Sequence, residues 1–234
     1  MLLVKRRFYN FIFYCVIFIT RYLWPISIRK KFIIFKHRKV VVLGSGPSLN
    51  NVKLGKVDDY LLVAINGAVY SEVFLNFPGS KFCFTADGSR GDELFDFCKT
   101  NDIRMVISTH TIYHLSLKCI LALKTVIFFL PAIKLNSLRL EFKSKTVEQF
   151  EEVGMFPVSA GFGSLSHFLQ FVNQNVTEEI HLFGFDFSEE KGKYFQGSPD
   201  SMNRNVNFLE KSLSDYLVIR KILIDNKIVL FDGR

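Results

Sequence analysis

From Lys39 onward, short apolar runs alternate with longer amphipathic stretches, a pattern typical of strands and helices that follow one another in βα units. The apolar runs are rich in Val, Ile and Phe, as expected for strands buried on both faces of a parallel sheet. We predict seven strands, over residues 39–43, 61–65, 81–85, 103–108, 125–130, 179–183 and 228–231. This order predicts an α/β fold with a Rossmann-like, doubly wound and mainly parallel sheet.

The amphipathic stretches predict the helices between these strands. They lie over residues 67–75, 90–100, 111–123, 161–174 and 206–225. In the last of these helices, apolar residues approximate helical spacing, and we expect them to face the sheet. The expected sheet-facing residues are Val206, Leu209, Leu213, Leu217 and Ile222.

Two stretches, residues 131–158 and 186–205, do not follow the alternation. The second is rich in Ser, Gly, Asn, Lys and Glu and follows a strand end, where ligands bind in open α/β sheets. We interpret it as a lid over a substrate, with a plain surface loop as the alternative.

Residues 1–38 form a separate segment with Lys and Arg but no Asp or Glu. Within it, residues 8–20 are an almost unbroken apolar run, shorter than the roughly 20 residues needed to span a bilayer core. Tyr22 and Trp24 suit the headgroup region, so we predict a helix that lies on the membrane surface. The alternatives are a single span that includes Arg21 and a cleaved signal.

Residues 39–234 are long enough for one domain, and 49% of the 234-residue sequence is hydrophobic. The formal net charge of +8 fits an anionic partner. Because much of the excess lies in the N-terminal segment, it favours a membrane surface rather than nucleic acid. The four cysteines are scattered without metal-binding spacing, which fits a reducing, cytoplasmic setting.

The first strand runs into the sequence GSGPSL at residues 44–49. We expect this loop to present free backbone N–H groups to a phosphate, with its glycines permitting close approach. It lacks the third glycine of a dinucleotide fingerprint and the GK[ST] of a P-loop. A tight turn with two glycines is therefore the alternative.

Polar groups follow three other strands. The Asn66 amide can donate and accept toward a ribose, base or sugar, and the helix-like residues after Gly67 favour a site over an Asn-Gly turn. Asp87 ends the third strand, either as a site carboxylate or as a turn or N-cap residue. Asp186 follows the strand at 179–183, and Tyr194 lies beyond it in the expected lid.

The sequence SAGFGS at residues 159–164 opens a predicted helix, where small residues and the positive dipole end suit an anion. The histidines form no HExxH, and His110 and His114 lack carboxylate or thiolate companions. No D-x-D sequence occurs. We therefore expect neither a metal site nor a cofactor.

Together these motifs resemble those of the bacterial CMP-sialic-acid-dependent sialyltransferases and the related lipopolysaccharide-core Kdo transferases, a glycosyltransferase family 42-like group. The resemblance covers about residues 39–200 and rests on GSGPSL, VAINGA, FTADGS, Ser159-Ala160-Gly161 and GFDF with Tyr194 beyond. It implies a Rossmann-type fold and metal-independent, inverting transfer of an acidic sugar from CMP to a lipopolysaccharide or lipooligosaccharide acceptor. It also implies action at the cytoplasmic face of the bacterial inner membrane.

Carried over residue by residue, the resemblance implies a donor-binding set. The set is Gly44, Ser45, Gly46, Asn66, Ser159, Ala160, Gly161 and Asp186. Residues 44–46 would contact the CMP phosphate and ribose, residues 159–161 the nucleotide or the donor carboxylate, and Asp186 the cytidine ribose. The Tyr194 hydroxyl would donate to the departing phosphate and stabilise its developing charge.

The sequence departs from the sialyltransferase pattern at three places. Ser45 stands where those enzymes usually carry Asn, Ser188 replaces a tyrosine, and no histidine follows His181. The lid histidine proposed as their general base therefore has no counterpart, which favours the Kdo-transferase-like branch. A carboxylate would then take the acceptor proton. The candidates are Asp87, Glu189 and Asp200.

Two other interpretations remain open. The archaeal-type pterin pyrophosphokinases and related motility-associated proteins share GSGPSL and an Asp at the end of the third strand. That function requires Mg²⁺-ATP and clustered carboxylates, to which Asp87 and Asp92 would contribute. The third interpretation, a non-enzymatic scaffold with a nucleotide-binding fold, would explain the missing base.

Overall fold

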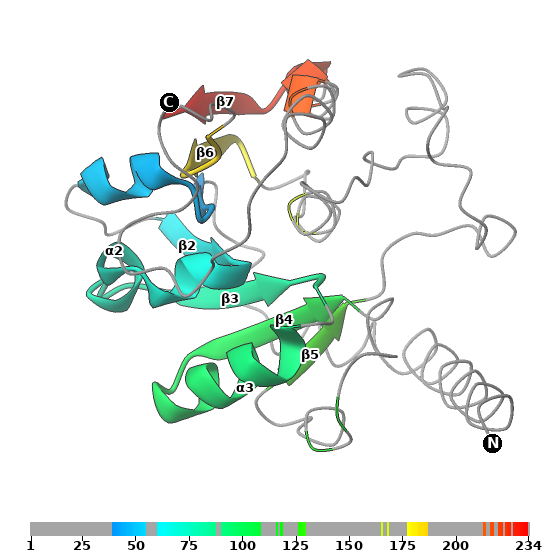
Figure 1. Ribbon diagram of the computed structural model, residues 1–234. Helices are drawn as coiled ribbons and strands as arrows, with labels where there is room; N and C mark the ends of the chain where they lie inside the picture. Colours follow the sequence, from blue (N-terminus) through cyan, green and yellow to red (C-terminus); the bar gives the residue numbers. More distant parts are fainter. Residues whose placement is uncertain are drawn as a thin grey trace, which may run out of the picture.

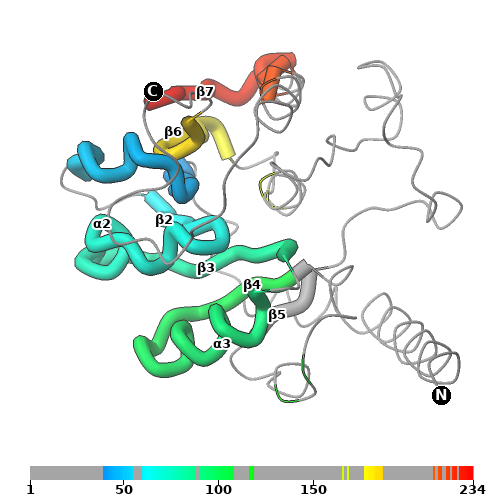
Figure 2. The backbone as a smooth tube through the Cα atoms, in the orientation of Figure 1, coloured from blue at the N-terminus to red at the C-terminus, as the bar shows by residue number. Residues whose placement is uncertain are grey.

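The structure is a computed structural model. The residues that it describes, apart from strand residues 126–129, are coloured in Figure 2. They are 39–54, 60–87, 90–108, 116, 118, 126–129, 165, 168, 177–186, 213, 216–217, 220–221, 223–225 and 227–233.

The described strands form one seven-stranded sheet in the order β5-β4-β3-β2-β1-β6-β7 (Figure 1). They are β1 (Lys39–Leu43), β2 (Tyr60–Ile65), β3 (Lys81–Thr85), β4 (Arg104–Ser108), β5 (Val126–Phe129), β6 (Glu179–Phe183) and β7 (Val229–Asp232). All six pairings between neighbours are parallel. The seven predicted strands are thus confirmed, three of them with identical bounds.

The chain builds this sheet outward from its middle. It runs from β1 through β2, β3 and β4 to β5, then returns to place β6 and β7 on the other side of β1. The direction of winding therefore changes between β1 and β6. In open α/β sheets the crevice at such a switch point is where ligands bind, and this architecture confirms the predicted doubly wound fold.

Alternate strand residues face two separate hydrophobic cores, as the period of two along a strand requires. Val41, Leu62 and Cys83 contribute to the first core, which η3 (Asn66–Tyr70), α2 (Glu72–Leu75) and α3 (Gly91–Thr100) cover. The second core uses the intervening strand residues. Among them are Val40, Leu61 and Phe82, and they pack with Leu165, Phe168, Tyr216 and Leu223.

The face that the last helix turns to the sheet differs from the predicted one. Leu213 and Leu217, expected to face the sheet, are 38% and 54% exposed, whereas Tyr216 and Leu223 are fully buried in the second core. The Tyr216 hydroxyl donates to Asp232 Oδ2 at 2.5 Å. Burying the tyrosine ring therefore leaves its polar tip bonded, and the helix presents the Tyr216 face inward.

Several predicted features lie outside the described residues. They are residues 1–38, most of the helices at 111–123 and 161–174, the lid beyond residue 186, and Val206, Leu209 and Ile222. Lys118, Leu165 and Phe168, which are described, are helical as predicted. Among the described residues, no helix combines the length and apolarity needed to cross a membrane.

Candidate functional site

The loops that leave β1 and β6 pack against each other at the switch point. Leu43 and Phe183 are paired at the ends of the two strands. Beyond them, the Gly44 N–H donates to Phe183 O at 2.7 Å, and the Gly46 N–H donates to Gly184 O at 2.7 Å. The ladder between the two strands thus continues into the loops, although the strands themselves have ended.

Asp186 completes this junction. Its side chain lies at the carboxyl edge of the sheet, the residue is only 6% exposed, and its Oδ2 accepts a hydrogen bond from the Ser48 N–H at 2.9 Å. Ser48 belongs to the short 3-10 helix η2 (Pro47–Asn51), so the carboxylate lies against the first turn of that helix. A negative charge is favourable at this position because the backbone N–H groups point toward it. Among the described residues, no other group donates to Asp186.

The glycines in the two loops are required by this close packing. A Cβ on Gly44 would lie 2.5 Å from Gly184 O, and a Cβ on Gly46 would lie 2.6 Å from the same oxygen and closer still to Asp186 Oδ2. Gly184 has a φ of +74° and would place a Cβ against Gly44 O. A side chain at any of the three positions would separate the loops.

The expectation that the GSGPSL loop offers free backbone N–H groups is wrong for most of the loop. The amides of Gly44, Gly46 and Ser48 donate to residues 183–186, and the Leu49 N–H donates to Gly46 O at 3.1 Å. Because the glycines lack side chains, the backbone of residues 184–186 approaches them closely. Within the described part of the chain, the Ser45 N–H has no acceptor.

A second polar group lies at the same edge, at the ends of β2 and β3. Asn66 has a φ of 51° and begins η3, so the predicted helix follows β2. The Thr85 hydroxyl donates to Asn66 Oδ1 at 2.8 Å and accepts from the Asp87 N–H at 3.0 Å. Thr85 is fully buried, and its hydroxyl fixes which end of the Asn66 amide is the acceptor.

Thr85 is a site residue that the sequence analysis missed. As the last residue of a strand of apolar and aromatic residues, it looks like an ordinary strand threonine. Only the pairing of β2 with β3 brings its hydroxyl to Asn66. A threonine at the end of one strand and an asparagine at the end of the preceding strand form a sequence signal that could have identified Thr85.

The order β3-β2-β1-β6 places the two groups along one edge. Strands lie about 4.8 Å apart, so the edge from Asp87 to Asp186 extends over roughly 14 Å. The structure thus joins Gly44, Gly46 and Asp186 in one junction and Asn66 and Asp87 in another, with Ser45 in the loop between. This is an elongated polar edge with acceptors at both ends and an amide in the middle.

A side-chain hydrogen bond joins η3, the element that begins at Asn66, to α3. The Tyr70 hydroxyl donates to Glu93 Oε1 at 2.6 Å, and Arg90 also donates to Glu93, at 3.1 Å. Burial, and then the hydrogen bond to Glu93, raise the pKa of Tyr70 well above its ordinary range, while the same hydrogen bond lowers the pKa of Glu93.

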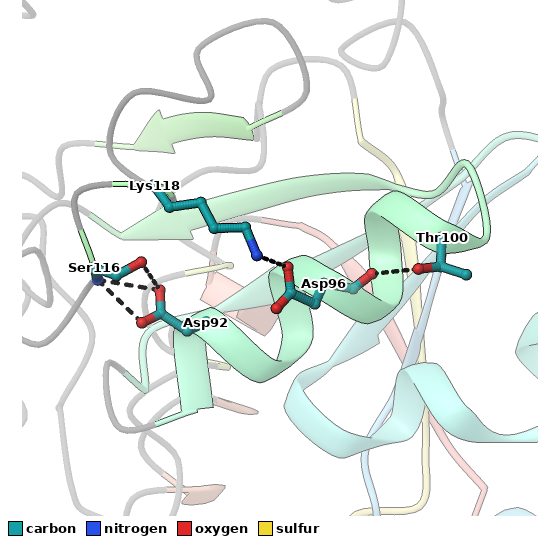
Figure 3. Close-up of polar contacts among 5 residues, drawn as sticks. All are labelled: Asp92, Asp96, Thr100, Ser116 and Lys118. Carbon is teal, nitrogen blue, oxygen red and sulfur yellow. Dashed lines mark hydrogen bonds and ion pairs between the residues drawn. The ribbon is translucent and has the colours of Figure 1, made fainter.

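Asp92, a candidate metal ligand under the pyrophosphokinase interpretation, serves a different purpose. Figure 3 shows its carboxylate directed at Ser116, whose N–H and hydroxyl both donate to it, the hydroxyl at 2.7 Å. One turn further along α3, Lys118 Nζ contacts Asp96 Oδ1 at 2.5 Å. These bonds hold Ser116 and Lys118 against α3. Among the described residues, no three His, Cys, Asp or Glu side chains gather as metal ligands.

The remaining predicted site residues lie outside the described part of the chain. They are Ser159, Ala160, Gly161, Tyr194, Glu189 and Asp200. His181 is described and lies in the middle of β6, where it stacks on Phe231 with ring centroids 4.3 Å apart and contacts Glu179. It is therefore remote from the carboxyl edge.

No protein-family model matches the chain. No curated protein matches its sequence. Among solved structures, the chain is similar to that of the sialyltransferase CstII from Campylobacter jejuni in complex with CMP, with a TM-score of 0.48 and 17% identity over 84% of this chain and 80% of that one. It is also similar to the CstII structure in complex with CMP-3FNeuAc, with a TM-score of 0.45 and 15% identity over 83% of this chain and 80% of that one.

Proposed function

We propose that this chain is a glycosyltransferase that moves an acidic sugar of the Kdo or sialic acid type from CMP to a lipopolysaccharide or lipooligosaccharide acceptor, with inversion and without a metal. The observation that carries the proposal is Asp186, a buried carboxylate at the switch point to which the Ser48 N–H alone donates among the described residues. The second support is the order of the strand-end motifs, which resembles that of the CMP-sugar transferases.

The charge of Asp186 decides how a nucleotide would lie along the edge. A phosphate beside this carboxylate would meet like charge, which is unfavourable in a partly buried site. Ribose hydroxyls, in contrast, would donate to Asp186 Oδ1 in charge-assisted hydrogen bonds. We therefore place the ribose at Asp186 and the phosphate toward Ser45 and Asn66.

The middle of the edge would hold the phosphate. The Ser45 N–H has no acceptor among the described residues. The Thr85 hydroxyl occupies Asn66 Oδ1, so the donor end of the Asn66 amide is directed elsewhere, and we place it toward the phosphate. Ser159, Ala160 and Gly161 would bind the nucleotide or the donor carboxylate in the same proposal. No metal or cofactor takes part.

The transfer step would use two further groups. The acceptor hydroxyl attacks the anomeric carbon, the bond from that carbon to the phosphate oxygen breaks, and its electron pair remains on CMP. Asp87 would accept the proton of the hydroxyl as general base. Tyr194 would donate a hydrogen bond to the departing phosphate, an interaction worth about 2.7 to 4 kcal/mol in comparable sites.

The glycolipid acceptor places the proposed enzyme at the cytoplasmic face of the bacterial inner membrane. Residues 1–38, which are basic and apolar, would hold it at the membrane surface. The catalytic domain would comprise residues 39–234, with residues 186–205 closing over the bound donor.

The test is acceptor-dependent release of CMP. The full chain is incubated in EDTA with CMP-Kdo or CMP-sialic acid, with and without a bacterial lipooligosaccharide extract, and free CMP and the extended glycolipid are quantified. The proposal predicts release that requires the acceptor and withstands EDTA. Turnover of Mg²⁺-ATP instead would favour a pyrophosphokinase, and turnover of neither nucleotide would favour a scaffold.

A further inference from the structure

The helix that precedes β7 presents an apolar stripe to solvent. Leu213, Leu217 and Ile224 have exposed fractions of 38%, 54% and 49%. A helix turns by about 100° per residue, so these three side chains fall within about 40° of one another around its axis. Tyr216 and Leu223 occupy another face and are buried. The stripe is therefore additional to the surface that holds the helix on the sheet.

Two cations share this outer side. Arg220 and Lys221 are exposed, one seven residues after Leu213 and the other four after Leu217, and such spacings place side chains on one face of a helix. Lys227 is exposed in the turn that follows. Between residues 213 and 225, the structure describes one exposed acidic residue, Asp225. The described outer side is therefore net positive as well as apolar.

We infer that this lipid-docking face, made of Leu213, Leu217, Arg220, Lys221 and Ile224, binds the surface of an anionic membrane. Aliphatic side chains on such a helix enter the boundary between headgroups and acyl chains, while flanking cations contact lipid phosphates. A symmetric contact between two copies would instead bury the Arg220 and Lys221 cations of both copies in one interface. The charge pattern thus fits an anionic surface better than a second copy.

The docking face begins near the candidate site. Tyr216 bonds to Asp232 at the carboxyl end of β7, whereas the Ile228 N–H donates to Leu223 O just before that strand begins. The helix therefore runs antiparallel to β7, with Tyr216, in its first described turn, at the carboxyl edge. A membrane on this face would lie beside the edge that carries Asp186. This membrane docking is independent of residues 1–38, and it does not depend on the proposed sugar transfer.

The experiment measures binding of the full chain to phosphatidylcholine vesicles with and without phosphatidylglycerol, in the absence of nucleotide. Hydroxyl-radical labelling reports the solvent access of single side chains. On anionic vesicles, labelling of Leu213, Leu217 and Ile224 should fall by several-fold. Labelling of Val229 and Phe231, which are 52% and 46% exposed on β7, should stay constant.

Variants separate this face from the rest of the chain. Replacing Leu213, Leu217 and Ile224 together by Ser should weaken vesicle binding roughly tenfold or more. Val229→Ser with Phe231→Ser removes exposed apolar side chains from β7 and should leave binding unchanged. Arg220→Gln with Lys221→Gln should weaken binding to anionic vesicles about tenfold or more and reduce its salt dependence.

Two results would overturn the inference. The first is that the wild-type chain sediments with vesicles while the three aliphatic side chains label as before, which would assign all binding to other segments. The second is protection of these side chains that grows with protein concentration without vesicles, which would assign the face to a second copy. The labelling uses the wild-type chain, so it shows whether this face contacts the membrane even where a variant fails to fold.

Discussion

The Ser48 N–H donates to Asp186 Oδ2 at 2.9 Å, although 138 positions of sequence separate the two residues. This bond fixes the loop after β1 against the loop after β6 at the point where the sheet changes its direction of winding. A buried carboxylate is thereby held at the position where an α/β sheet binds its ligand. The proposed orientation of the nucleotide follows from that placement.

Gly46→Ala should disrupt this junction. The new Cβ would collide with Asp186 Oδ2 and would also lie 2.6 Å from Gly184 O and 3.0 Å from Asp186 N, which are backbone atoms and cannot turn aside as a side chain can. We expect a loss of unfolding free energy of about 1 to 3 kcal/mol, as for other overpacked sites, measured by urea denaturation. Lys53→Ala, at an exposed position near the same loop, is the control. Equal stability of the two variants would show that the loops are not in close contact.

Thr85→Val should weaken nucleotide binding through Asn66. The valine keeps the shape of the buried side chain but leaves Asn66 Oδ1 and the Asp87 N–H without the hydroxyl. We expect a stability loss of about 1 to 3 kcal/mol and at least a severalfold weaker affinity for CMP by calorimetry. Thr85→Ser restores the hydroxyl and should recover CMP affinity. If valine and serine variants bind CMP alike, Thr85 does not position Asn66.

Lys81→Met should lower stability without touching the site. Lys81 Nζ donates to the carbonyl oxygens of Phe74, Leu75 and Phe77 at 2.7 to 3.0 Å and so closes the end of α2. Desolvation lowers the pKa of this lysine. Hydrogen bonds from charged donors contribute about 1.5 to 3 kcal/mol, so we expect a clear fall in the urea midpoint. Lys99→Met, exposed on α3, should behave like the wild type, and an unchanged midpoint for both would refute the capping role.

Alkaline pH should destabilise the contact between η3 and α3. Burial and the bond to Glu93 raise the pKa of Tyr70 in the folded state. The unfolded chain ionises first, at about pH 10, so the contribution is present below that pH and is lost as the pH rises above it. The free energy of unfolding should fall more steeply there for the wild type than for Tyr70→Phe. Parallel curves would mean that Tyr70 ionises alike in both states.

The sheet could be predicted from the sequence because its strands are buried on both faces. Runs such as VVVL in β1 and FCF in β3 are apolar throughout, and the polar residues that follow mark where each strand ends. The face of the last helix was predicted wrongly, because spacing alone does not reveal that Tyr216 has a partner in Asp232. Burying the Tyr216 ring with its hydroxyl bonded to Asp232 is favoured over burying Leu213 and Leu217.

The role of the glycine loop could not be predicted from the sequence for a similar reason. Free amides in residues 44–49 were inferred from the loop alone, whereas the amides of Gly44, Gly46 and Ser48 have their acceptors in residues 183–186. Nothing in the local sequence states that β6 will be the neighbour of β1. The same holds for Thr85, whose bond to Asn66 depends on the register between β2 and β3.

Calorimetric titration of CMP in EDTA shows whether Asp186 binds the nucleotide of a CMP-linked sugar without metal. Asp186→Asn keeps an oxygen for the Ser48 N–H but removes the charge, so the variant should fold. We predict that CMP binds the wild type and that the variant binds it about tenfold or more weakly, which corresponds to the loss of a charge-assisted hydrogen bond. Equal affinity for CMP in the two proteins, or binding of ATP only with Mg²⁺, would show that Asp186 does not bind a CMP-linked sugar.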